Sequence, residues 1–133
     1  MDSTQPYRTS SDLVLKTLSI LGVLAAGQSV DPEDFATVND NLDSIFRKLS
    51  ALEICYVPDP DNIPGEWFMD LAAIVAGEVA TDFGAGPDTL PTLVNRGLGG
   101  FGNVPIGAGT AAQSLKIMLR GRPTGEPLRT DSF

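Results

Sequence analysis

The segment from residue 31 to about residue 52 limits the possible folds of this chain more than any other. It opens with Asp31-Pro32-Glu33-Asp34, in which Asp31 can accept hydrogen bonds from the free amides of a first helical turn and Pro32 suits the first helical position. The apolar residues that follow recur at helical spacing on a single face: Phe35, Val38, Leu42, Ile45, Phe46 and Leu49. A helix of this length with one apolar face must pack along its side against other elements, which favours a helical bundle.

Four further segments show helical periodicity. Ser11 or Asp12 can cap the first and Gly22 can stop it, while Thr110 can cap the last. The alanine-rich segment that starts near residue 64 allows close approach of its neighbours, so we expect it to be the most buried helix. The segments span residues 11–21, 64–83, 89–98 and 111–120. The predicted fold class is therefore all-α, a small bundle of about four to five helices.

The stretches between and beyond these helices divide the chain. Residues 54–62 are β-prone at first and then acidic and proline-rich, which predicts an extended hook loop. Six glycines in residues 97–109 are too many for a stable helix or strand, so we expect a loop that becomes ordered on assembly. The predicted divisions are an irregular N-terminal arm (1–10), the helical bundle domain (11–96), the Gly-rich loop (97–109), a C-terminal helix (110–120) and an irregular C-terminal tail (121–133).

Charge is distributed unevenly along the chain. The net charge is −8, which argues against broad binding to nucleic acid, because such binding needs clustered Lys and Arg. Residues 1–90 hold 15 acids and 4 bases, whereas residues 91–133 hold 2 acids and 5 bases. We therefore expect the two parts to meet different partners.

Two features of the sequence suggest a cofactor-binding or catalytic site, but the residues around them argue against it. Residues 97–102 match the dinucleotide-binding pattern G-x-G-x-x-G, but no strand precedes them and no acidic residue follows at the ribose-binding distance, so we interpret them as a loop. Cys55 is the only cysteine and the chain has no histidine. A thiolate nucleophile would lack a base and a Cys/His zinc site cannot be built from one chain, so Cys55 is interpreted as structural.

The acidic pairs are also explained by local structure. Glu33 with Asp34 lies at a helix start, and Asp59 with Asp61 lies in a turn, where carboxylates cap backbone amides. Residues 59–62 could attract a divalent cation weakly, but they lack the glycine and distal glutamate of a calcium loop. We therefore predict no catalytic, cofactor-binding or metal site and expect that the chain is not an enzyme.

The candidate functional residues are those that could contact a partner. Trp67 is either an interface anchor or a core residue at a helix start. Four basic residues near the C-terminus form the only basic run, which is either a solvated tail or a docking element for an acidic surface or packaged DNA. The predicted interface residues are Trp67, Phe101, Lys116, Arg120, Arg122, Arg129 and Phe133.

The order of elements resembles a known family. The residues that carry the likeness are Ser11-Asp12-Leu13-Val14, Leu18, Leu21-Gly22-Val23-Leu24-Ala25-Ala26-Gly27-Gln28, Asp31, Asp34, Val38, Asn41-Leu42-Asp43-Ser44-Ile45 and Ile54-Cys55-Tyr56. Together with the alanine-rich helix they resemble, over residues 11–96, the head-tail adaptors of short-tailed bacteriophages, also called head-completion, packaged-DNA stabilisation or tail accessory factors. The Gly-rich loop departs from that pattern, where a more continuous helical hairpin would be expected.

The resemblance implies a structural virion protein. It would form a ring of about twelve copies that connects the capsid portal to tail or nozzle proteins and helps to retain packaged DNA. DNA would pass through the channel without sequence-specific binding, and the protein would be assembled in the host cytoplasm and located at the head-tail interface of the virion. The apolar stretch of residues 13–26 is too short to span a bilayer, so no membrane is expected. The alternative is an acidic helical module that binds or regulates a basic partner protein.

Overall fold

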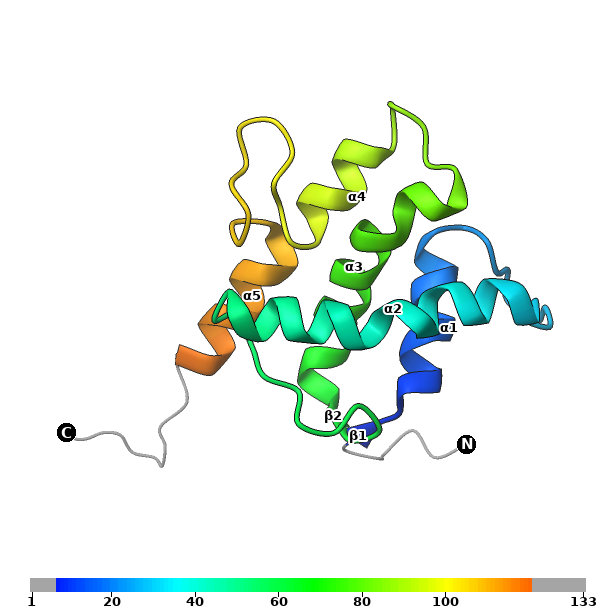
Figure 1. Ribbon diagram of the computed structural model, residues 1–133, viewed down its shortest axis with the longest axis horizontal. Helices are drawn as coiled ribbons and strands as arrows, with labels where there is room; N and C mark the ends of the chain where they lie inside the picture. The colour runs from blue at the N-terminus through cyan, green and yellow to red at the C-terminus, as the bar shows by residue number, and fades with distance from the viewer. Residues whose placement is uncertain (1–6, 121–133) are drawn as a thin grey trace.

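The structure is a computed structural model that describes residues 7–120, and the side chain of Arg120 is not among the described ones. Within this part the chain forms five α-helices, one short 3-10 helix and a two-stranded sheet (Figure 1). The elements in order are β1 (Tyr7–Arg8), α1 (Ser10–Ile20), α2 (Pro32–Ala51), β2 (Ile63–Pro64), α3 (Gly65–Val79), the 3-10 helix η1 (Ala80–Phe83), α4 (Leu90–Arg96) and α5 (Thr110–Arg120). The predicted all-α bundle is confirmed.

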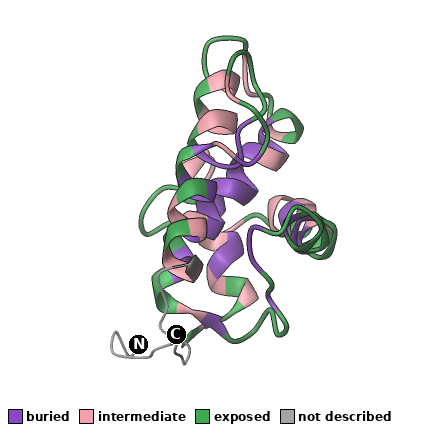
Figure 2. Cartoon of the chain, turned by 90° about the vertical axis from the view of Figure 1, so that its left-hand side faces the viewer, coloured by how far each residue is buried: buried purple, intermediate pink, exposed green. Residues whose placement is uncertain are grey.

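Helix α2 begins as its sequence predicts. The Oδ1 atom of Asp31 accepts a hydrogen bond from the amide of Glu33 at 2.9 Å, and Pro32 is the first helical residue. The helix crosses in front of α3 in Figure 1 and is seen end-on in Figure 2, where its buried side faces the rest of the molecule. The buried side consists of Val38, Leu42, Ile45, Phe46 and Leu49, while Phe35 is only partly buried.

Helix α3 is the centre of the bundle, because it contacts α1, α2, α4 and α5. Ten of its 15 residues are buried, so the expectation that it is the most buried helix is confirmed. Its small residues set the distance to α4: a Cβ atom added to Gly77 would lie 2.8 Å from the carbonyl oxygen of Leu93. The α4 backbone therefore packs directly on α3.

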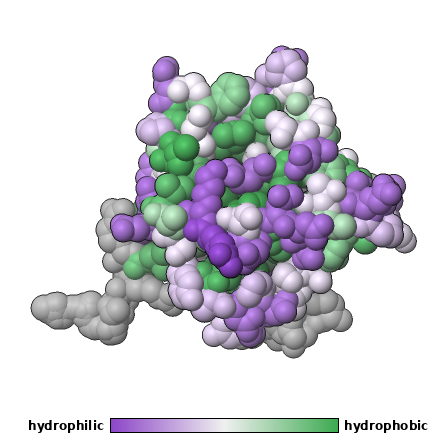
Figure 3. Space-filling view, viewed as in Figure 1, coloured by the Kyte–Doolittle hydropathy of each residue, from purple (hydrophilic) through white to green (hydrophobic). Residues whose placement is uncertain are grey.

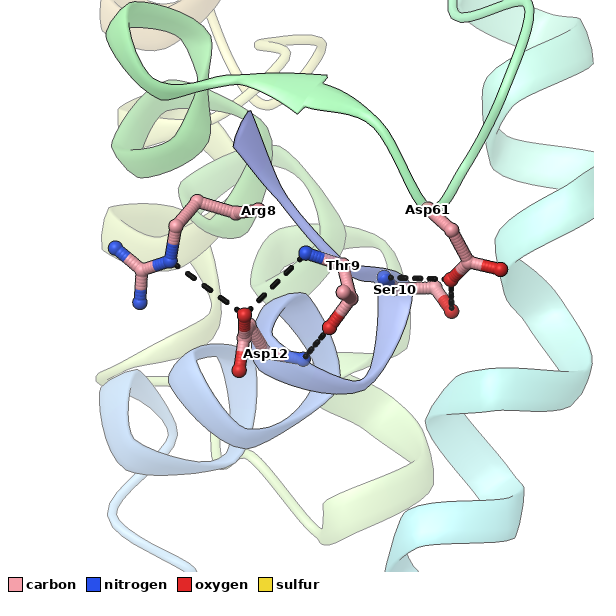
Figure 4. A network of polar contacts seen from close by, with 5 residues as sticks. All are labelled: Arg8, Thr9, Ser10, Asp12 and Asp61. Atoms are coloured by element: carbon pink, nitrogen blue, oxygen red, sulfur yellow. Dashed lines mark hydrogen bonds and ion pairs between the residues drawn. The ribbon is translucent and has the colours of Figure 1, made fainter. Parts of the chain in front are cut away.

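The start of the described chain is more ordered than expected. β1 pairs antiparallel with β2, with Tyr7 opposite Pro64 and Arg8 opposite Ile63. Thr9, and not Ser11 or Asp12, caps α1: its hydroxyl accepts from the Asp12 amide at 3.2 Å, and the Asp12 carboxylate accepts from the Thr9 amide at 3.3 Å (Figure 4). The predicted arm therefore does not extend to residue 10, because this reciprocal capping box satisfies the amides of the first turn.

The Gly-rich loop has a defined conformation within one chain. The amides of Gly107 and Gly109 both donate to the carbonyl oxygen of Leu98, at 2.8 and 3.1 Å, and the Gly100 amide donates to Val104 at 2.8 Å. Leu98 is 2% exposed. The expectation that this loop becomes ordered only on assembly is therefore wrong, because backbone hydrogen bonds and a buried leucine hold it in the lone subunit.

Helix α5 belongs to the same core as the rest of the bundle. It begins at Thr110, which is its first helical residue and not its cap. Ala111, Ala112 and Leu115 are buried in the common core cluster, against α3. The C-terminal helix that the sequence sets apart from the bundle domain thus shares its packing.

Candidate interaction surface

Three of the seven exposed large apolar side chains among the described residues lie in the C-terminal third of that part of the chain. Phe101 is 41% exposed, Ile106 is 57% exposed and Ile117 is 62% exposed. The first two lie on the Gly-rich loop and the third on α5, which together form the left side of the molecule in Figure 1. We call these three residues the C-terminal apolar surface. A contiguous apolar patch on a small protein marks a site of contact with another molecule, and these three residues are the candidates for such a patch.

The loop residues of this surface are held in place from α4. The Asn95 side chain donates to the Phe101 carbonyl and accepts from the Phe101 amide, both at 3.2 Å. Ile106 lies over Gly100, where an added Cβ atom would meet its side chain at 2.8 Å. The loop therefore presents Phe101 and Ile106 from a fixed backbone.

Lys116 has a structural role in addition to its charge. Its Nζ donates to the carbonyl oxygen of Gly107 at 2.8 Å, and the side chain is partly buried. Arg96 at the end of α4 is exposed. Residues 90–119 contain these two bases and no acid, so this segment carries a net positive charge in a chain that is otherwise acidic.

The outward face of α5 is exposed or partly exposed from Thr110 to Ile117, among the residues that the structure describes. Thr110, Gln113, Ser114 and Ile117 follow one another at helical spacing, opposite the buried face. With Ala108 and Met118 they line a shallow hollow of about 590 Å³. No other part of the described chain fills it.

Of the other predicted interface residues, the structure describes the side chain of Trp67 alone. Trp67 is only 8% exposed at the start of α3, so of its two interpretations the structure favours the core position. Arg120 is the last residue of α5, and nothing is described of its side chain. Arg122, Arg129 and Phe133 lie outside the described residues.

A groove with the opposite charge lies on the other side of the bundle. It has a volume of about 450 Å³ between the end of α1 and the corner that joins α3 to α4, at the right in Figure 1. We call it the α1–α4 groove. Its apolar lining consists of Ile20, Leu21, Ala80, Phe83, Ala85 and Leu93. Residues 80–93 hold two exposed acids, Asp82 and Asp88, and no base.

The acidic residues of the hook loop accept hydrogen bonds that hold the loop and the start of α1 in place. Asp59 accepts from the Asp61 amide at 3.0 Å and from the Asn62 side chain at 2.7 Å, and these hydrogen bonds lower the pKa of the Asp59 carboxyl below its ordinary value. Asp61 in turn accepts from both the amide and the hydroxyl of Ser10, at 3.2 and 2.9 Å (Figure 4). Asp59 therefore has the predicted turn role, and Asp61 connects the loop to the start of α1, a contact that the sequence analysis missed.

The structure also shows where the remaining candidates for a reactive or cofactor-binding site lie. Cys55 is 5% exposed, and burial raises the pKa of its thiol to about 11, so it stays protonated at neutral pH. The glycine pattern of residues 97–102 follows α4 and not a strand, which confirms that it is a loop. Within residues 7–120, no group of three or more Cys, Asp or Glu side chains is placed to hold a metal ion.

Sequence reasoning missed several exposed apolar residues: Tyr56, Met69, Ile106 and Ile117. The exposure of Ile117 could have been predicted from the sequence. Ala111, Ala112 and Leu115 form one stripe of α5, and Ile117 is two residues beyond Leu115, on the opposite face of a helix with 3.6 residues per turn. No such signal exists for Ile106, since a loop has no period.

Figure 3 shows how side-chain character is distributed on one face of the molecule. Hydrophilic residues gather across the middle of this view, where α2 crosses, and hydrophobic residues lie above them. Among the helices of residues 7–120, none combines the length and apolar character needed to cross a membrane. No protein-family model, curated protein or solved structure matches the chain.

Proposed function

We propose that this chain is a structural assembly subunit, the head-to-tail adaptor of a tailed bacteriophage, and not an enzyme. In this proposal copies of the chain form a ring of about twelve subunits between the capsid portal and the tail, located in the virion and assembled in the host cytoplasm. The observation that carries the proposal is the C-terminal apolar surface. Its exposed residues project from a well-packed bundle, as expected of a subunit that is completed by its partners.

The use of the acidic side chains supports a structural role. Asp12, Asp31, Asp59 and Asp61 each accept hydrogen bonds from backbone amides at helix starts or in the hook loop. Their carboxylates therefore stabilise local backbone, which is a function that requires no substrate.

The charge distribution supports a channel-lining subunit. Residues 7–90 hold 14 acids against 4 bases, so a ring of such subunits would present an acidic wall. An acidic wall repels phosphates and would let packaged DNA pass without adhering to it. The proposed partners are therefore other copies, the portal protein and tail or nozzle proteins.

The test is co-purification with a portal candidate, followed by mass measurement and imaging of the complex. The expected result is a closed ring with cyclic symmetry bound to the portal. Ile106→Asp should abolish portal binding, whereas Met69→Asp, which changes another exposed apolar residue on α3, should not. A monomer without affinity for any portal would overturn the proposal, and selective binding of a basic protein by that monomer would favour the acidic regulatory module instead.

A further inference from the structure

The face of α5 that points away from the core has the properties of one half of an interface. Ala111, Ala112 and Leu115 bury one side of the helix, and the opposite side ends in Ile117, the most exposed apolar residue of α5. The small side chains of Thr110 and Ser114 on that opposite side allow another chain to approach the helix closely.

The charge next to this face is fixed in position. The hydrogen bond from Lys116 to Gly107 holds the ammonium group beside the helix, and residues 90–119 contain two bases and no acid. A partner surface that matches it must be apolar with acidic residues at its edge.

The α1–α4 groove has these matching properties. Its walls are formed by Ile20, Leu21, Phe83 and Leu93, and Asp88 lies among its lining residues. Its side of the bundle is opposite to α5 in Figure 1, so one molecule cannot fill its own groove with its own α5 face.

We propose that the α5 face of one copy, with Ile117 as its anchor, occupies the α1–α4 groove of the next copy. The ammonium group of Lys116 then lies on the side of the contact that meets Asp88 of the neighbour, the acid among the groove's lining residues. Because the two surfaces differ, the contact is heterologous and repeats from copy to copy, closing into a ring if the rotation permits. The inference rests on the proposed function in one respect, that the chain assembles with copies of itself.

The test uses the full chain with two introduced cysteines, Ile117→Cys on α5 and Thr92→Cys, which replaces an exposed residue lining the groove. Native Cys55 can stay, because it is 5% exposed and its thiol pKa is about 11. A heterologous contact joins the two cysteines between successive copies, so oxidation should give a ladder of covalent trimers and larger species. Each single-cysteine variant should give no species above a dimer.

The matched control combines Thr92→Cys with Met69→Cys, since Met69 is also exposed but lies on α3. This pair should give no ladder. An equal ladder from the control pair, efficient dimers from Ile117→Cys alone, or no ladder from the test pair would each overturn the inference. In sedimentation, Ile117→Asp should weaken self-association by at least about tenfold. Met69→Asp should leave it unchanged, and circular dichroism checks that both variants fold.

The two proposals can fail separately. A ladder without affinity for a portal would remove the adaptor function and leave the interface in place. Portal binding without a ladder would leave the function and remove this interface.

Discussion

The hook loop and the Gly-rich loop both connect helices without regular structure, yet they are held in opposite ways. The hook is organised by side chains, since the carboxylates of Asp59 and Asp61 accept hydrogen bonds from the loop and from Ser10. The Gly-rich loop is organised mainly by backbone, with the Leu98 carbonyl oxygen accepting from two glycine amides. The first arrangement depends on charge, and the second depends on the absence of side chains.

This difference determines what each loop tolerates. Where a carboxylate holds a turn, protonation or loss of the carboxylate releases it. Where two backbone segments approach closely, there is no room for a side chain, so substitution of a glycine disrupts the loop. A change of pH has no effect there, because no group in the contact titrates. Substitutions and changes of pH should therefore affect the two loops differently. The expected effects are given from the largest to the smallest.

Gly109→Ala is expected to have the largest effect. The added Cβ atom would collide with the carbonyl oxygen of Gly97 and lie 2.5 Å from the amide nitrogen of Gly99. Backbone must shift to relieve this, at a cost of roughly 3 kcal/mol in the free energy of unfolding, measured by denaturant titration. Gly86→Ala is the control, since an added Cβ atom there meets nothing within 4 Å. Equal stability of the two variants would show that the loop is not held by close backbone contact.

Asp61→Ala tests the hook and should destabilise the protein by about 1 kcal/mol. It removes the acceptor for the amide and hydroxyl of Ser10 and so loosens the start of α1. The midpoint of thermal unfolding measures the effect. Asp43→Ala is the matched control: its ion pair with Arg47 joins two side chains that are both 80% exposed, so its loss should change stability little. A similar loss in both variants would contradict a specific role for Asp61.

Lys116→Met removes the one side-chain hydrogen bond that we find on the Gly-rich loop outside Asn95. The Met side chain keeps much of the apolar stem, so only the bond from Nζ to Gly107 is lost, at a cost of about 0.5 to 1 kcal/mol. The amides of Gly107 and Gly109 should stay protected in hydrogen exchange, because their acceptor is the Leu98 carbonyl. Loss of that protection would show that the loop depends on the lysine.

Acidification should release the hook and leave the Gly-rich loop unchanged. The folded pKa of Asp59 is lowered from 3.8, so its contribution is present above that value and is lost as the pH falls through the lower folded pKa. Nuclear magnetic resonance should show the Asp61 amide resonance shifting in this window, with the Gly107 amide constant. In Asp59→Asn the acceptor oxygen remains but does not titrate, so the shift of the Asp61 amide should disappear. Persistence of the shift would assign it to another group.

Much of the helical framework could be predicted from sequence, for physical reasons that differ by element. Asp31-Pro32 and the apolar face that follows are local signals, and α2 spans Pro32–Ala51 almost as expected. The α1 cap was misplaced although Thr9-Ser10-Ser11-Asp12 has the spacing of a capping box. The reason is that the residues before Ser11 show no hydrophobic periodicity. A strand of two residues, such as β1, is too short to produce such a pattern.

The candidate surface was less predictable. Phe101 and Lys116 were named from composition and charge, but the hydrogen bond of Lys116 to Gly107 depends on how the loop folds back onto α5. The burial of Trp67 and the exposure of Ile106 are set by tertiary packing, which leaves no pattern in the local sequence. The order of the Gly-rich loop was missed for the same reason, because contacts such as Gly97 against the Ala73 carbonyl join residues far apart in the chain.

The position of Trp67 gives the molecule a built-in optical probe. It is the only tryptophan in the chain, it is 8% exposed, and it lies in the first turn of α3 directly after β2. Its indole emission therefore reports on a single place, the foot of the central helix, where the first described strand joins the bundle. Events at the distant Gly-rich loop should leave the spectrum unchanged, whereas separation of β1 from β2 should shift it toward longer wavelengths without any added label.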